Sequence, residues 1–146
     1  MQTTEKARRV FRGNYAELWL SDRRIAELTG FKAEVSKRYN TVDLCGDTWE
    51  YQRKISQSGT GTMDLYRVDS FTDVEEVAAL ETGADPIYTV ISKINDPDSA
   101  GAERWAFFNV HLENITLADF KAKNFAQRSV KFHFAGCEPL DSVKAE

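Results

Sequence analysis

The chain has 146 residues, and a composition that is 42% hydrophobic and 29% charged is typical of one globular domain that buries its own core. The net charge of −4 argues against a protein that coats nucleic acid, and no apolar run approaches the ~20 residues of a membrane helix. The charged N-terminus lacks the apolar segment of a secretory signal, so we expect the protein to stay in the compartment where it is made.

The first half of the chain predicts β-strands, because apolar residues recur at every second position in residues 14–36. The segment 38–48 is rich in turn-forming residues and predicts a loop. The segments WEYQRKIS and GTMDLYRV flank Gln57-Ser58-Gly59-Thr60 and predict a hairpin that turns at these four residues, since glycine accepts positive φ.

One short helix is predicted over residues 70–82, where apolar residues recur at helical spacing. Ser70 or Thr72 can cap its start, and Thr72 with Glu75 fits a capping box. Gly83 is expected to end the helix.

The second half predicts three more strands. They cover residues 87–95, 103–112 and 129–136; in the second strand we expect Ala106, Phe108, Val110 and Leu112 to share one face, and in the third Val130, Phe132 and Phe134. The sequence therefore predicts a mainly β domain over residues 14–136, with a basic N-terminal arm at 1–13 and a loosely held C-terminal arm at 137–146.

An acidic turn lies between two of these strands. Asp96-x-Asp98-x-x-Gly101 matches the beginning of a calcium-binding EF-hand loop, but Phe107 stands where the loop requires a bidentate glutamate. We therefore expect a hairpin turn in which Asn95, Asp96, Asp98 and Ser99 cap backbone groups.

No catalytic, metal or cofactor site is predicted. The two histidines, His111 and His133, lie on polar strand faces without a hydrolase signature, and two histidines are too few for a metal centre. Cys45 and Cys137 are far apart in sequence; we favour reduced thiols over a disulfide. A small hydrolase that uses either histidine remains an alternative.

Aromatic and basic residues interleave in Trp49, Tyr51, Arg53 and Lys54. This pattern is found on sheets that bind single-stranded nucleic acid, so a monomeric nucleic-acid-binding β-barrel module is a second alternative. We favour an ordinary strand with Trp49, Tyr51 and Ile55 on the core side, because the stripe is short and the net charge is negative.

Three segments carry a resemblance to a known family: NYAELWLSDRRIAELTGFKAEV, GTGTMDLYRV and DPIYTVISKINDPDSAGAERWAFFNVHLENITLADF. From about Gly13 to Gly136 the chain resembles the tail tube proteins of contractile phage tails and of phage-like elements of Gram-positive bacteria. The resemblance implies two packed antiparallel sheets in a β-sandwich or barrel-like fold, and a structural role without catalysis. It also implies six-subunit rings, stacked into a hollow tube inside a sheath, through which DNA passes transiently.

The resemblance also implies which residues make contacts. Ring stacking is expected of Tyr39, Asn40, Thr41, Asp43, Trp49, Tyr51, Arg53, Lys54, Gln57 and Ser58, and contact with the sheath of Asp73, Glu75, Glu76 and Glu81. The implied partners are further copies of the chain, the sheath, the baseplate and the tape-measure protein, in a tail or tail-like particle assembled in the bacterial cytoplasm. Membrane binding by the monomer is not expected, and a noncontractile tail tube is a close alternative.

Overall fold

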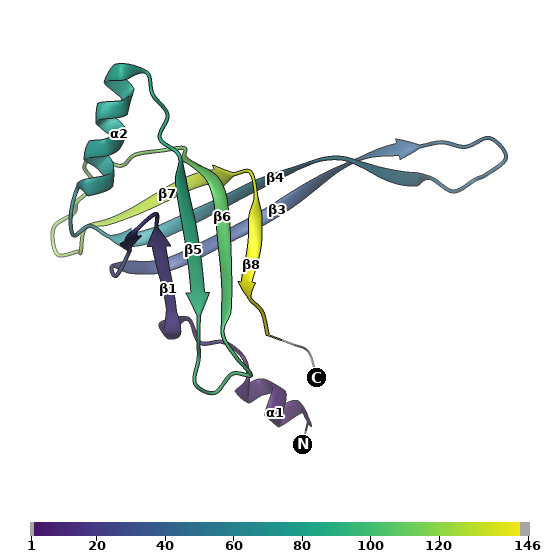
Figure 1. The fold of residues 1–146 in the computed structure, drawn as a ribbon, viewed down its shortest axis with the longest axis horizontal. Coiled ribbons are helices and arrows are strands. Elements are labelled where there is room, and N and C mark those ends of the chain that lie inside the picture. The colour runs from purple at the N-terminus through teal and green to yellow at the C-terminus, as the bar shows by residue number, and fades with distance from the viewer. Residues whose placement is uncertain (1, 144–146) are drawn as a thin grey trace.

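The computed structural model describes residues 2–143, and these residues form one antiparallel system of eight strands with two helices (Figure 1). In chain order the elements are α1 (Gln2–Arg8), β1 (Ala16–Leu20), β2 (Arg23–Arg24), β3 (Leu28–Val42), β4 (Tyr51–Tyr66), α2 (Phe71–Thr82), β5 (Tyr88–Ile94), β6 (Glu103–Leu112), β7 (Gln127–Phe134) and β8 (Cys137–Asp141). A short 3₁₀ turn, Gly13–Tyr15, precedes β1.

Strand β6 joins two sheets that pack against each other. The strand order is β2-β1-β5-β6-β7-β4-β3, with β8 also paired to β6. The first part of β6 pairs with β5 and β8, whereas its last residues, His111 and Leu112, pair with β7. The predicted class, mainly β with two packed antiparallel sheets, is confirmed; the helix α1 was not predicted.

The core lies between the two sheets, and both sheets contribute aliphatic and aromatic side chains to it. Leu18 of β1 and Val90 of β5 are fully buried opposite Phe132 of β7. The Phe132 ring stacks on Phe31 of β3 with centroids 5.8 Å apart. Burial of this apolar surface is the main contribution to the stability of the domain.

Strands β3 and β4 form one long hairpin; the predicted turn at 57–60 was wrong, and the predicted loop at 38–48 is correct only in its second half. β3 continues to Val42, and β4 runs without interruption from Tyr51 through Gly59, so the chain reverses at residues 43–50. The glycines at 59 and 61 serve close packing instead. A Cβ at Gly59 would lie 2.4 Å from the Phe134 ring, and one at Gly61 would lie 2.3 Å from the Phe132 ring.

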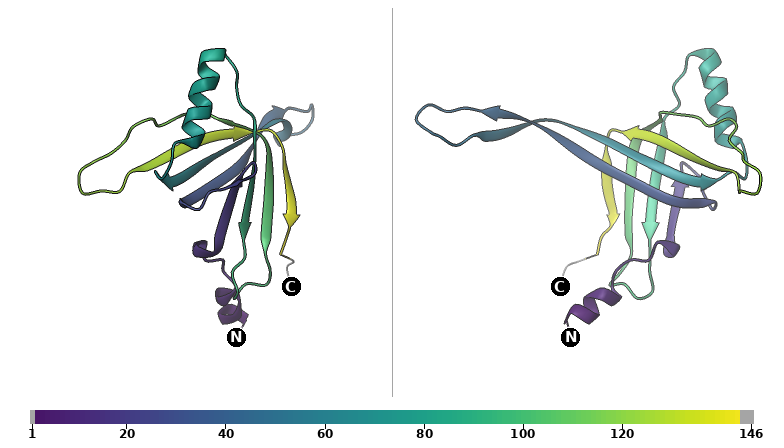
Figure 2. Two further views of the ribbon diagram at one scale, coloured as in Figure 1. Left: turned by 60° about the vertical axis from the view of Figure 1, so that its left-hand side comes forward. Right: turned by 180° about the vertical axis from the view of Figure 1, so that it is seen from behind.

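The outer half of this hairpin projects beyond both sheets (Figures 1 and 2). All residues from Glu34 to Thr41 and from Tyr51 to Ser58 are exposed. Trp49, Tyr51 and Ile55 therefore do not face the core as predicted, because the hairpin has left the core by this point.

The predicted face of β6 was also wrong. Asn109 has φ 53°, and the register passes from Val90 opposite Phe107 to Tyr88 opposite Val110. This β-bulge inserts a residue, so that Phe107 and Val110 both belong to the core while Phe108 does not. In β7 the alternation is as predicted, with Val130, Phe132 and Phe134 buried.

The tail after Gly136 is part of the sheet rather than a loose arm. Cys137–Asp141 forms β8, which pairs with β6 and carries an ion pair between Asp141 and Arg104 at 2.7 Å. Residues 144–146 of the predicted arm lie outside the described residues.

Helix α2 begins one residue later than predicted and ends at the predicted residue, with Gly83 as a left-handed C-cap at φ 77°. The predicted capping box was wrong because Thr72 lies inside the helix; the backbone N–H of Phe71 donates to Asp69 Oδ1 at 3.2 Å instead. Within residues 2–143 no helix combines the length and apolar character needed to span a membrane.

The contact between Gly61 and Phe132 gives a first prediction. Replacing Gly61 by alanine places a methyl group against Phe132 and 2.5 Å from the Lys32 carbonyl oxygen, so we expect a loss of about 1–3 kcal/mol in the free energy of unfolding, measured by urea denaturation. Gly13→Ala is the matched control, because nothing lies within 4 Å of its added methyl group. Equal stability of the two variants would contradict the close packing.

Candidate assembly surfaces

The residues expected to stack rings all lie on the projecting hairpin. Tyr39, Asn40 and Thr41 belong to the outer part of β3, and Asp43 and Trp49 to the turn. Tyr51, Arg53, Lys54, Gln57 and Ser58 belong to β4. Every one of these side chains is exposed, so the structure gathers two separately predicted segments on a single element.

Hydrogen bonds within the tip of the hairpin define the conformation of its turn. Asp47 accepts hydrogen bonds from the backbone N–H of Trp49 at 2.9 Å and from the Tyr51 hydroxyl. The Tyr51 hydrogen bond, with the Trp49 bond second, lowers the pKa of the Asp47 carboxyl. The tip is therefore a shaped turn that presents the Trp49 side chain.

Large apolar side chains on this hairpin face solvent. Trp49 is 76% exposed and Ile55 50%, and Leu44, Tyr39 and Tyr51 are exposed as well. Exposed apolar surface is typical of protein interaction sites when it is contiguous, so the hairpin is a candidate assembly surface.

Helix α2 is held to the body by buried charges, which corrects part of the prediction for the sheath. Asp73 is 7% exposed and accepts hydrogen bonds from Arg128 at 2.8 Å and Arg67 at 2.9 Å. Glu76 is also buried and accepts a hydrogen bond from the Tyr88 hydroxyl at 3.0 Å. Neither carboxylate can face a sheath, whereas Glu75 and Glu81 are exposed and remain candidates.

The acidic turn binds an arginine of its own chain. Asp96 is 2% exposed; its carboxylate accepts hydrogen bonds from Arg12 Nε at 2.7 Å, Arg12 Nη2 at 2.8 Å and the Arg12 backbone N–H at 3.0 Å. The Arg12 side chain holds the pKa of Asp96 well below its usual range. Asp96 thus ties the N-terminal arm to the β5–β6 turn.

Of the four residues predicted to cap this turn, Asp96 and Ser99 have side chains that bond to its backbone. The Asp98 backbone N–H donates to Asp96 Oδ1 at 2.9 Å, and the Ser99 hydroxyl donates to the carbonyl oxygens of Asp96 and Gly101 at 2.7 Å. The Asp98 carboxylate does not cap the backbone but accepts a hydrogen bond from Arg12 at 3.1 Å.

The two histidines meet where β6 pairs with β7. Their rings stack with centroids 5.2 Å apart, and each lies beside a carboxylate: His111 Nδ1 is 2.9 Å from Asp85 Oδ2, and His133 Nδ1 is 3.3 Å from Glu113 Oε1. Among residues 2–143 no group of three or more histidine, cysteine or acidic side chains is arranged to hold a metal ion. The histidines form a polar cluster at a strand junction.

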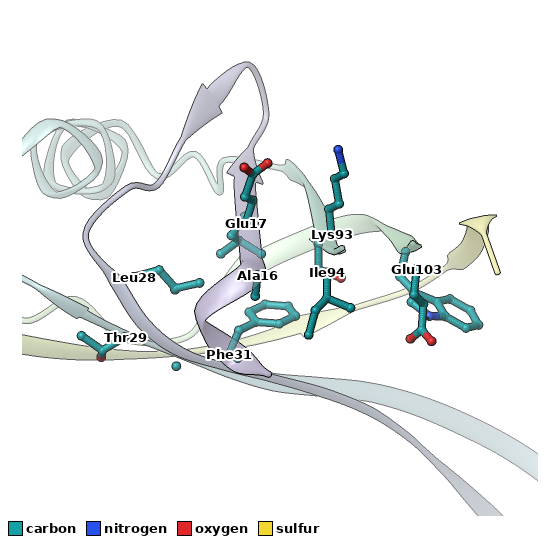
Figure 3. Close-up of a pocket in the computed structure, with 13 residues that line it drawn as sticks. Ala16, Glu17, Leu28, Thr29, Phe31, Lys93, Ile94 and Glu103 are labelled. Atoms are coloured by element: carbon teal, nitrogen blue, oxygen red, sulfur yellow. The ribbon is translucent and has the colours of Figure 1, made fainter. Parts of the chain in front are cut away.

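A groove of about 430 Å³ opens where the two sheets separate, between β1 and β5 on one side and the start of β3 on the other (Figure 3). Its lining includes Leu28, Phe31 and Ile94, with the charged side chains of Glu17, Lys93 and Glu103 around them. The apolar core thus reaches the surface between the edges of the two sheets.

The family follows from a match over nearly the whole chain: the model of a family described as "Phage tail tube protein" covers residues 3–141. The chain belongs to the phage tail tube protein family. This family is structural rather than enzymatic, which excludes the hydrolase alternative and favours a tail tube over a monomeric nucleic-acid-binding module.

Two relatives in Bacillus subtilis (strain 168) match most of this tail tube chain. The uncharacterized protein YqbM is 25% identical over 142 residues, which cover 96% of this chain and 97% of the relative. The phage-like element PBSX protein XkdM is 26% identical over 131 residues, which cover 88% and 89%. The second match agrees with the predicted resemblance to phage-like elements of Gram-positive bacteria.

Solved structures share the fold at low sequence identity. One is a chain of the PVC extracellular contractile injection system, from the sheath-tube complex in the extended state. It has a TM-score of 0.73 at 9% identity, and the match covers 97% of this chain and 99% of the other. The tube terminating cap of the anti-feeding prophage has the same TM-score and identity, over 91% and 92% of the two chains. A gene transfer agent tail with C6 symmetry has a TM-score of 0.51 at 15% identity, over 93% of this chain and all of the other.

The buried carboxylate of α2 gives a second prediction. Replacing Asp73 by alanine leaves the buried Arg128 without its ion-pair partner, so we expect a loss of about 3–5 kcal/mol in the free energy of unfolding. Glu81→Ala, in the exposed last turn of the same helix, should change stability by less than about 0.5 kcal/mol. Chemical denaturation of both variants measures the difference, and a small effect of Asp73→Ala would show that Arg128 finds another partner.

Glu76 gives a third prediction, about pH. Burial raises the pKa of the Glu76 carboxyl above its ordinary value of 4.5, so its ionised form is less favourable in the folded state than in the unfolded state. The resulting loss of stability is absent below the unfolded pKa and fully present above the folded pKa. The melting temperature of Glu76→Gln minus that of the original chain should therefore increase as the pH is raised from 4 to 7. A difference that is constant over this range would contradict the prediction.

Proposed function

We propose that copies of this chain form hexameric rings that stack into the inner tube of a contractile phage tail or phage-tail-like particle. The tube would be a conduit for DNA or effectors. The observation that carries the proposal is the projecting hairpin, whose exposed apolar side chains have no use in a protein that remains a monomer.

Free strand edges support ring formation. Among the described strands β3 pairs with β4 alone, so its other edge is open along most of its 15 residues. An open edge of this length invites pairing with another chain, and closing a barrel around a lumen removes such edges. The C6 symmetry of the gene transfer agent tail, which has the same fold, is consistent with six subunits per ring.

The structural neighbours support a contractile particle. The PVC chain comes from a sheath-tube complex, and on our chain the exposed Glu75 and Glu81 of α2 are the acids that remain available to a basic sheath surface. Contacts with a baseplate and a tape-measure protein at the two ends of the tube, and assembly in the bacterial cytoplasm, complete the proposal. A net charge of −4 suits a channel that must release a polyanion.

Electron microscopy tests this function. We expect the purified chain, concentrated at neutral pH, to form rings or hollow tubes in negative stain. Replacing both Trp49 and Ile55 by serine should raise the critical concentration for assembly at least about tenfold, which corresponds to ~1.4 kcal/mol per contact, because apolar anchors carry most of an interface's energy.

Leu80→Ser is the matched control, since Leu80 is 70% exposed but lies on α2. It should leave tube formation unchanged. Tubes from the doubly substituted hairpin at the original concentration would contradict a role of the hairpin. If the original chain remains monomeric at every concentration, even with a tail baseplate added to nucleate it, the proposed function is wrong.

A further inference from the structure

A second apolar surface lies at the opposite end of the molecule from the hairpin tip. It is formed by the segment between β6 and β7, residues 113–126, which contains the most exposed large apolar side chains of the described chain: Phe120 at 83% and Phe125 at 82%, with Leu117 at 59%. Figures 1 and 2 show this segment and the hairpin extending in opposite directions from the two sheets.

Hydrogen bonds hold this segment in place. Arg67 donates to the carbonyl oxygens of Thr116 and Leu117 at 2.7 and 2.9 Å, and its guanidinium is itself fixed by Asp73. The Asn114 side chain accepts from the Lys131 backbone N–H at 2.6 Å and donates to the Ser129 carbonyl oxygen at 3.0 Å. Further along, the Phe125 ring meets the Tyr66 ring edge-on at 5.9 Å.

The hairpin tip is acidic, and the 113–126 segment carries two lysines close to its exposed Phe120. Residues 43–50 at the hairpin tip contain three acids, Asp43, Asp47 and Glu50, and no basic residue. Residues 113–126 contain two lysines, Lys121 and Lys123, close to Phe120, and two acids, Asp119 and Glu113, of which Glu113 lies beside His133. One end is therefore acidic with Trp49 and Leu44 uncovered, and the other presents two lysines beside uncovered phenylalanines.

We propose that the hairpin tip of one copy binds the 113–126 segment of another, so that Trp49 packs among Leu117, Phe120 and Phe125 while the acids of the tip meet Lys121 and Lys123. The inference rests on the proposed function and specifies which surface receives the hairpin. Because the two surfaces differ, the contact is heterologous and joins copies head to tail. The tube then has a direction, and every ring offers the same free surface to the next.

Cys45 of the hairpin tip provides a cross-linking test without any change to the tip. In the variant Phe120→Cys with Cys137→Ser, each copy carries one thiol at either end. Cross-linking within one copy is excluded because the two ends extend in opposite directions. Under mild oxidation we expect a ladder of disulfide-linked dimers, trimers and longer chains on a non-reducing gel.

The matched control is Leu80→Cys with Cys137→Ser, which places a similarly exposed thiol on α2 and should give dimers at most. A Phe120→Cys variant that forms tubes in the microscope but gives no ladder above this control overturns the inference and leaves the proposed function standing. A chain that forms neither tubes nor a ladder overturns both.

Charge exchange separates this contact from a general effect on folding. Lys121→Glu with Lys123→Glu, and separately Asp43→Lys with Glu50→Lys, should each raise the critical concentration for assembly at least about tenfold. Combining all four substitutions should restore it to within about threefold of the original chain, because the attraction is re-formed with opposite signs. A combined variant that assembles no better than either pair overturns the inference.

Discussion

The sheets and the projecting hairpin both depend on one contact, between two glycines of β4 and two phenylalanines of β7. Gly59 and Gly61 leave empty the space that the rings of Phe134 and Phe132 occupy, so each ring lies over the glycine that it is paired with. The same rings pack against Phe31 of β3 and Phe107 of β6. Because dense packing of this kind allows few alternative arrangements, the base of the hairpin is fixed. Its outer half can then leave the core in a defined direction without support of its own.

Buried carboxylates attach the peripheral elements to this core. Asp73 binds Arg67 and Arg128 and holds α2, and Asp96 binds Arg12 and holds the N-terminal arm. A carboxylate in such a place costs free energy to desolvate and is tolerated only with its partner in position, so each pair fixes a geometry more than it adds stability. The carboxylates of Asp73 and Glu76, which were expected on the surface, are buried. Other residues determine the charge of the two exposed ends.

The sequence was informative where structure is local. The helix α2 and the alternation of β7 follow from spacing within one element, and the resemblance selected the segments that the hairpin unites. The position of the turn was not predictable in this way. A glycine at 59 is compatible with a turn of positive φ and equally with a strand in which it makes room for a ring from β7, and the local sequence does not distinguish the two. Asp73 was misplaced for a similar reason: its partner Arg128 is 55 residues away. The exposed Phe120 and Phe125 had one local signal, aromatic residues in a segment with no strand or helix period.

Assembly and the properties of the monomer have the same physical origin. A two-stranded ribbon gains little stability on its own, and the apolar groups at both ends of this chain face water in the single copy. In the proposed assembly, association would bury this apolar surface and add support to the outer half of the hairpin. The proposed contact between unlike ends has a further consequence, because each added ring would regenerate the surface that binds the next. The contact alone would then set no limit to growth, and another component would have to set the length of the tube.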